Sequence, residues 1–310
     1  MIVHPRVSWL RLLFTFRGSS LRRDWYRIAA ATLLSVVVSW VGMRYDLKSW
    51  SLTVTPFTVI GLALSIFLGF RNNACYDRFW EGRKLWGQLV NVSRSLTRQL
   101  LTLTVSGSAE STQKEYQKQT VLRLAGYVYS LKHHLRTTDP TGDLQNRFSE
   151  AELQTVHDQH NIPLALLQII ARRIERTWKD GGLNDWNMQS VEGSLTEITA
   201  IQGGCERILN TPVPFTYTVL IHRVVAFYCF ALPFGIWDTV GALSPLVVFL
   251  ISHAFFGLDV IGDEIEDPFG TDINDLPLDT ITRTIEINLL DLLDEPNVPD
   301  LPEPVDGVLY

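Results

Sequence analysis

Long stretches without charged residues dominate the pattern of this 310-residue chain. Residues 28–43, 49–70 and 224–258 contain no Asp, Glu, Lys or Arg except Asp238. A helix crosses a bilayer core of about 30 Å with roughly 20 apolar residues, so residues 49–70 are long enough for one crossing. The last stretch has Asp238 and Pro245 near its middle and is long enough for two crossings joined by a tight turn. The pattern predicts four transmembrane helices, at about residues 28–45, 50–71, 217–238 and 240–259.

The flanks of these stretches predict their orientation. Residues 1–27 hold six Arg and one Asp, and residues 71–98 hold six Lys or Arg, whereas the segments near Asp46 and Asp238 are short and nearly neutral. The positive-inside rule therefore places both termini and the middle segment in the cytoplasm. The alternative, a soluble all-α protein with buried core helices, is disfavoured because such cores rarely need 35 residues with a single charge.

The middle segment, residues 72–216, is predicted to be a cytoplasmic helical region. Amphipathic stretches alternate there with turn signals such as Pro140-Thr141-Gly142, and Pro163 suits the start of a helix. No strand-like alternation is sustained, so we expect an all-α membrane protein whose helices extend into the cytoplasm. The segment 260–310 is acidic, and its proline-rich end is expected to be disordered or to lie as a strap on a neighbouring surface.

Charge and cysteine content exclude several functional classes of protein. The net charge of −6 belongs to residues 259–310, which hold 15 Asp or Glu and one Arg, and the balance argues against nucleic-acid binding. The three cysteines are an odd number without paired spacing, so the sequence predicts neither a disulfide framework nor a zinc site. The histidine pair His157 and His160 is better explained as a solvated helix end than as a metal site. Without a nucleophile elbow or a phosphate loop, we predict no enzyme and no required cofactor.

The second predicted span carries a regular apolar stripe. Leu62, Ile66 and Phe70 recur every four residues on one helix face, with small residues such as Gly61 and Gly69 between them. One interpretation is that this face packs in the core of a helix bundle. The other is that several copies of the span surround an axis and form a hydrophobic constriction. Periodicity alone favours the first interpretation.

Mixed charges follow this span directly. Asp77 and Arg78 are followed by Glu81, Arg83 and Lys84. The spacing favours pairs on the helix surface, with Glu81 near Arg78 or Lys84, over groups that line an ion vestibule.

Four motifs together resemble the bestrophin ion channel family, in particular its prokaryotic branch. They occur in the family's order and reach from the N-terminal region to the acidic segment. The motifs are FRGSS at 16–20, SIFLGFRNNACYDRFWEGRKLWG at 65–87, PVPFTYTVLIHR at 212–223 and GDEIEDPFGTDINDLPLD at 262–279.

The resemblance implies a homopentameric channel that sits among membrane lipids and passes monovalent ions through a central pore. Its hydrophobic neck would be lined by Leu62, Ile66 and Phe70, and a cytoplasmic aperture would lie near Met188 or Gln189. Prokaryotic relatives are associated with sodium and potassium conduction, which favours a cation channel here. A chloride or other anion channel of the bestrophin type and a non-conducting membrane scaffold or sensor are the alternatives.

The acidic motif raises the question of calcium. In eukaryotic bestrophins a calcium clasp occupies this region, and its ligand positions are closest to Glu264, Asp267, Asp272 and Asp275 here. Crowded carboxylates around a turn suit calcium, which takes six to eight oxygens. The favoured interpretation is still a solvated acidic turn that forms salt bridges with arginines of the N-terminal segment, namely Arg17, Arg22 or Arg23.

Overall fold

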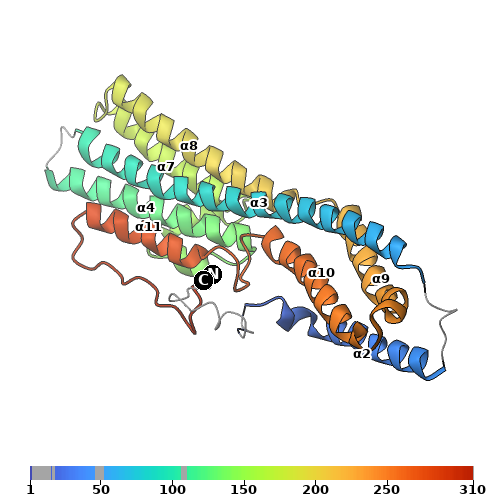
Figure 1. Ribbon diagram of the computed structural model, residues 1–310. Helices are drawn as coiled ribbons and strands as arrows, with labels where there is room; N and C mark the ends of the chain where they lie inside the picture. The colour runs from blue at the N-terminus through green and yellow to red at the C-terminus, as the bar shows by residue number, and fades with distance from the viewer. Residues whose placement is uncertain (2–14, 16–17, 46–51, 106–109, 310) are drawn as a thin grey trace. The chain divides into compact units, whose positions relative to one another are not determined.

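The computed structural model describes residues 1, 15, 18–45, 52–105 and 110–309, and the regular secondary structure within them is helical (Figure 1). The one β-type pairing in these ranges is an isolated bridge between Val305 and Val308. The prediction of an all-α fold is confirmed. The helices are α2 (Leu21–Tyr45), α3 (Val54–Leu103), α4 (Glu110–Arg136), α5 (Thr141–Leu144), α6 (Glu150–Val156), α7 (Ile162–Lys179), α8 (Asp185–Asn210), α9 (Phe215–Val240), α10 (Ser244–Glu266) and α11 (Leu278–Leu292), with a short 3-10 helix η2 (Gly241–Leu243).

The chain divides into two compact units. The apolar unit comprises residues 4–80 and 212–267, and the polar unit comprises residues 1–3, 81–211 and 268–310. Helix α3 is continuous over 50 residues and contributes its first part to the apolar unit and its second part to the polar unit.

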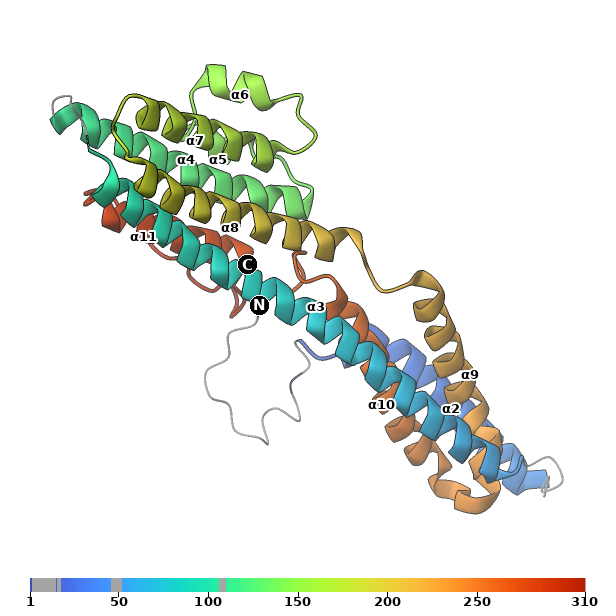
Figure 2. The ribbon, with the colours of Figure 1, turned by 90° about the horizontal axis from the view of Figure 1, so that it is seen from above.

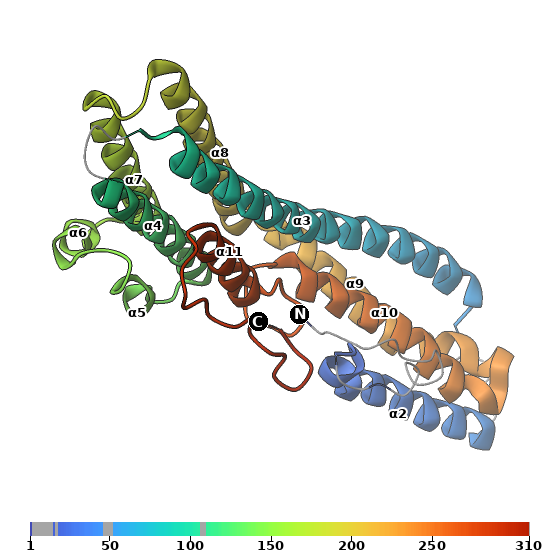
Figure 3. The same ribbon diagram turned by 90° about the vertical axis from the view of Figure 1, so that its left-hand side faces the viewer.

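The apolar unit packs α2, the first part of α3, α9 and α10 around one hydrophobic core. Helix α2 lies beside α10, and both contact α9 (Figure 3). Three stretches of the described chain are long and apolar enough to cross a membrane, namely Leu21–Tyr45, Val54–Leu103 and Phe215–Glu266. The third is divided by η2 into α9 and α10, between Asp238 and Pro245 as the sequence predicts. The core is formed by buried side chains that include Ile28, Leu64, Leu68, Val225, Leu232, Val248 and Phe256.

Helix α3 is much longer than the predicted span at residues 50–71. Residues 71–103 contain no proline, and the two glycines there, Gly82 and Gly87, are tolerated inside a helix at a modest energetic penalty. The sequence therefore gives no signal that ends the helix where its apolar residues end.

The polar unit is built around α4, which is buried along most of its length. Helices α7 and α11 pack against α4, and α8 contacts both α4 and α7 (Figure 2). Local signals explain the helix starts: Ser149 and Glu152 form a capping box at α6, and Asn161 caps α7 just before Pro163.

The C-terminal segment after α11 is irregular but is held to the polar unit. The Lys118 ammonium lies 2.7 Å from the Glu295 carboxylate, Val308 is fully buried, and the backbone N–H of Leu309 donates to the Met1 carbonyl at 2.9 Å. Of the two predicted outcomes for this segment, the strap lying on a surface is the one observed, and that surface belongs to the same chain.

Candidate functional site

One face of α3 in the apolar unit is left uncovered by the rest of the described chain. Leu62, Ile66 and Phe70 are 66%, 50% and 63% exposed, respectively. By contrast, Leu64 and Leu68 on the same helix are 3% and 0% exposed. The stripe that the periodicity singled out is therefore not part of the core of its own subunit, and the first of the two interpretations is wrong for the isolated chain.

Helix geometry shows that the uncovered and covered sides are opposed. At about 100° per residue, Leu62, Ile66 and Phe70 fall within an arc of roughly 80°. Leu64 and Leu68 fall on the roughly opposite side of the helix, where they meet the core of the apolar unit. The stripe thus points directly away from the subunit's own core.

The uncovered face continues beyond the apolar residues and becomes polar. Asn73 and Asp77 are exposed and fall within the same arc as Leu62, Ile66 and Phe70. Both residues follow the predicted end of the span at residue 71, where the helix is expected to leave the hydrocarbon region and meet water.

Small residues border the uncovered face. A Cβ atom added to Gly69 would meet nothing within 4 Å, and Ser65 is exposed although its hydroxyl donates to the Gly61 carbonyl at 2.8 Å. Gly61 instead lies close to Tyr228, whose hydroxyl oxygen would be 2.6 Å from an added Cβ. Exposed small residues let a second helix approach closely at this border.

A buried ionic cluster lies just after the stripe, on the covered side of α3. The Arg71 guanidinium is fully buried and forms an ion pair with Asp259 at 2.8 Å and another with Asp263. The second oxygen of Asp259 lies 2.6 Å from Nδ1 of His222. Sequence reasoning missed this cluster, because Arg71 resembles an ordinary charge at the end of a span. The available signal was the spacing of Asp259 and Asp263, four residues apart at the end of an apolar helix.

Two of the charged residues that follow Arg71 on α3, Arg78 and Glu81, also have partners. Nε of Arg78 donates to the Glu266 carbonyl at 3.1 Å, and the Glu266 carboxylate accepts from the Val213 backbone N–H at 3.0 Å. Glu81 forms an ion pair with Arg207 of α8, so the predicted pairing of Glu81 with Arg78 or Lys84 is wrong. Helix α8 lies beside this part of α3 in space although not in sequence, and spacing along one helix does not report such a neighbour.

The four predicted calcium ligands are divided between the two units. Glu264 lies in α10 with an oxygen 3.5 Å from Arg23, which is one of the salt bridges expected for a solvated acidic turn. Asp267 is the C-cap residue of α10. Asp272 and Asp275 bond to each other, because the Asp272 N–H donates to the Asp275 carboxylate at 2.7 Å. Within the described ranges, no group of three or more His, Cys, Asp or Glu is arranged to hold a metal ion. The arginine at position 17 lies outside the described residues.

The predicted aperture residues lie in the first turn of α8. Met188 is half-buried and Gln189 is exposed, and the Asn184 side chain caps the helix by accepting from the Asn187 N–H at 2.8 Å. The neighbouring Trp186 is 82% exposed, which the sequence did not single out. The role of Met188 and Gln189 as an aperture stays a prediction.

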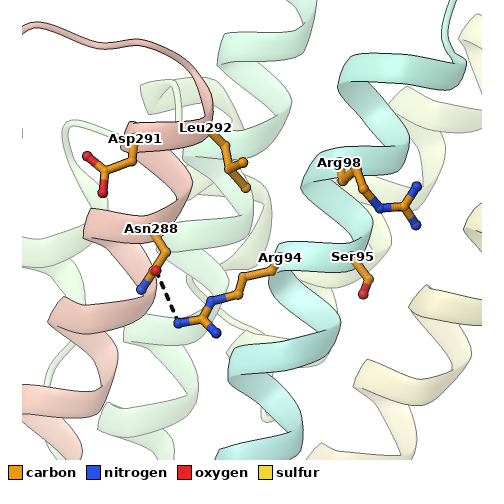
Figure 4. A pocket seen from close by; sticks show the side chains of 6 residues that line it. All are labelled: Arg94, Ser95, Arg98, Asn288, Asp291 and Leu292. Carbon is orange, nitrogen blue, oxygen red and sulfur yellow. Dashed lines mark hydrogen bonds between the residues drawn. The ribbon is translucent and has the colours of Figure 1, made fainter.

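The polar unit holds a small cavity of about 350 Å³ between α3 and α11 (Figure 4). Arg94 reaches across it and donates to the Asn288 side-chain oxygen at 3.1 Å, while the Arg98 guanidinium points away from α11 (Figure 4). The remaining lining residues are Ser95, Asp291 and Leu292. Both arginines are exposed, so this cavity is a surface feature of the polar unit.

Ion pairs also stabilise the polar unit. Burial opposes ionisation of Glu152, but hydrogen bonds from Arg123 and Ser149 outweigh it and lower the pKa of Glu152 to about 2. Burial likewise opposes ionisation of Asp279, and its bonds to Lys132 at 2.9 Å and Arg136 at 2.6 Å lower the pKa of that carboxyl. These carboxylates have partners within their own unit and serve to hold α4 to α6 and to α11.

Comparisons with known proteins agree with this architecture. The family model described as Bacterial/Fungal Bestrophin protein matches residues 1–291. The chain is 40% identical over 300 residues to a voltage-dependent anion channel-forming protein, RSc3414, of Ralstonia nicotianae, covering 97% of each chain. It is 38% identical to the voltage-dependent anion channel-forming protein YneE of Escherichia coli, covering 96% of each chain.

A solved structure gives the same result at the level of the fold. The crystal structure of a bacterial bestrophin homologue from Klebsiella pneumoniae superposes with a TM-score of 0.82 at 36% identity, covering 88% of this chain and 99% of that one. The family match spans both units and the uncovered face of α3. The chain belongs to the bacterial and fungal bestrophin family.

Proposed function

We propose that this chain is the subunit of an ion channel, a homopentamer in the bacterial inner membrane that passes monovalent ions through a central pore. The observation that carries the proposal is the uncovered face of α3. Leu62, Ile66 and Phe70 point away from the subunit core, and in an assembly with α3 nearest the axis they form a hydrophobic neck.

One feature favours an axis of identical helices as the neighbour of this face. The open border at Gly69 and Ser65 leaves room for a neighbouring α3. The polar residues Asn73 and Asp77 follow the predicted span, and in the assembly they would meet water at the end of the neck.

We infer cation conduction, chiefly of sodium and potassium. The one charged side chain on the uncovered face within residues 54–80 is acidic, which favours cations near the neck. Anion conduction is the second candidate, because the relatives are named as voltage-dependent anion channel-forming proteins. A scaffold that conducts nothing is the third.

The reversal potential of purified protein in planar bilayers under a tenfold KCl gradient separates these candidates. The proposal predicts a value near the potassium Nernst potential. A value near the chloride potential would assign the protein to anion conduction, and the absence of any current would favour a scaffold. Repeating the measurement with micromolar calcium tests the proposed calcium site. Calcium that acts on the channel through this site is expected to change the current. The site would be formed by Glu264, Asp267, Asp272 and Asp275.

Alanine substitutions test the neck. Replacing Leu62, Ile66 or Phe70 removes apolar bulk from a hydrophobic constriction, and each change is expected to raise single-channel conductance. Leu33→Ala is the matched control, because Leu33 of α2 is 65% exposed but lies on a different helix. Unchanged conductance in all three neck variants would contradict the proposed pore.

A further inference from the structure

We propose that Asp77 is the charge-selectivity residue of the conduction pathway, placed on the pore-facing side of α3 just beyond the hydrophobic neck. The proposal rests on the proposed function, because Asp77 reaches the pathway only where the uncovered face of α3 lines it. In an assembly of identical subunits, Asp77 then forms a ring of carboxylates that draws cations toward the neck and repels anions.

The position of Asp77 follows from the helix itself. Asp77 is seven residues after Phe70, which is two turns, or about 10 Å along the axis, and within about 20° of the same direction. Asn73 lies between them on the same face, one turn after Phe70. The order along this face is therefore apolar ring, amide ring and carboxylate ring.

Asp77 is the one charged residue on this face within residues 54–80. That part of α3 holds two basic residues, and both are directed elsewhere. Arg71 is fully buried against Asp259 and Asp263. Arg78 is half-buried and donates to the Glu266 carbonyl. The cationic side chains of the segment thus face the subunit's own α10, and the exposed charge that remains is negative.

The Asp77 carboxylate is also not neutralised locally. Among the described residues, the structure gives it no ion pair, whereas Asp259 and Asp263 are each paired with Arg71. A ring of unpaired carboxylates beside low-dielectric apolar walls concentrates counter-ions and focuses the field along the axis. Rings of Asp or Glu are a general means of selecting cations in channels.

Three variants of this face test the inference by the permeability ratio of potassium to chloride. Asp77→Asn keeps the size of the side chain and removes its charge, and we expect the ratio to fall roughly threefold or more. Asp77→Lys reverses the charge and is expected to lower the ratio further. Asn73→Asp adds a carboxylate to the same face, one turn closer to the neck, and is expected to raise it.

Asp158→Asn is the matched control, because Asp158 is an exposed carboxylate of the polar unit and its substitution changes the net charge by the same amount. A shift in this control equal to that of Asp77→Asn would overturn the proposal, because it would show a response to overall charge only. An unchanged permeability ratio in Asp77→Asn, Asp77→Lys and Asn73→Asp would overturn it as well.

The neck variants separate a failure of the pore assignment from a failure of the selectivity role of Asp77. If Leu62→Ala raises conductance while the Asp77 variants leave selectivity unchanged, the pore assignment holds and the selectivity assignment fails. If neither set changes the currents of a conducting protein, the proposed function itself fails. Elution of each variant at the wild-type position in size-exclusion chromatography confirms that it is assembled, and Asn73→Asp keeps the proposal testable where an Asp77 variant does not assemble.

Discussion

Leu62 and Leu68 are the same residue type on the same helix, yet they have opposite surroundings. Leu68 is fully buried in the core of the apolar unit, and Leu62 is 66% exposed. Arg71 and Asp77 repeat the contrast with charged residues, since Arg71 is buried among carboxylates and Asp77 is exposed without an ion pair in the described chain. The comparison shows that the two sides of α3 differ in what they contribute. One side holds the subunit together, and the other side is left uncovered by the rest of the described chain.

The largest effect is expected from Arg71 on the covered side. Arg71→Met leaves the buried Asp259 without its arginine partner and removes the partner of the exposed Asp263, and we expect the free energy of unfolding to fall by about 3–5 kcal/mol. Chemical denaturation in detergent measures it. The control is Arg44→Met, which removes an exposed arginine of α2 and is expected to change stability little. Equal stability of the two variants would contradict the structural role of Arg71.

The ion pair of Arg123 and Glu152 in the polar unit can be compared with that of Arg71 through the pH dependence of stability. The pKa of Glu152 is lowered to about 2 from an ordinary value of 4.5, so its contribution is complete above pH 4.5 and is lost as pH falls toward 2. The loss is on the order of 2 kcal/mol for this half-buried carboxylate. Denaturation midpoints between pH 6 and pH 3 measure it, and Arg123→Gln is expected to flatten the dependence. A slope as steep in Arg123→Gln as in the wild type would show that other carboxylates are responsible.

The two leucines test the comparison directly. Leu68→Ala opens a cavity in the core, and because lipid is as apolar as leucine, only the packing loss of about 1–3 kcal/mol is expected. Leu62→Ala removes the same atoms from an uncovered face and is expected to change subunit stability by less than about 0.5 kcal/mol while raising conductance. Thermal unfolding and bilayer recordings on the same preparations give both quantities. Equal destabilisation by both substitutions would mean that Leu62 is packed as tightly as Leu68.

A smaller loss of stability than that of Leu68→Ala is expected at the glycines that border the face. Gly61→Ala places a methyl group against Tyr228 and is expected to lower subunit stability by about 1 kcal/mol. Gly69→Ala has open space within its own subunit, so its effect is expected on assembly, through closer contact with a neighbouring α3. Native mass spectrometry of the detergent-solubilised protein reports the assembled fraction. A loss of assembly in Gly61→Ala alone would place the subunit contact elsewhere.

Much of the apolar unit could be predicted from the sequence, because hydrophobic runs longer than 20 residues have few other uses. The break between α9 and α10 and the stripe on α3 follow from Pro245 and from the spacing of Leu62, Ile66 and Phe70. The full length of α3 could not be predicted, since the helix continues after its hydrophobic pattern ends.

The buried ionic cluster around Arg71 could not be predicted from the sequence, for a different reason. The cluster of Arg71, His222 and Asp259 is joined by contacts between residues 37 and 188 positions apart, and the local pattern along one helix does not report such contacts. The four proposed calcium residues are close in sequence, yet Glu264 bonds to an arginine of α2 and Asp272 bonds to Asp275. The bond to Arg23 agrees with the favoured interpretation of a salt-bridged acidic turn, and a calcium site stays a prediction.

Cadmium block of a cysteine variant tests most directly whether the uncovered face of α3 lines the pore. The three native cysteines, Cys75, Cys205 and Cys229, are all buried, so the wild-type current is expected to be insensitive to micromolar Cd²⁺. The account predicts that Cd²⁺ blocks the current of Ile66→Cys and leaves that of Leu68→Cys, on the covered side, unchanged. Insensitive currents in conducting Leu62→Cys, Ile66→Cys and Phe70→Cys variants would contradict it.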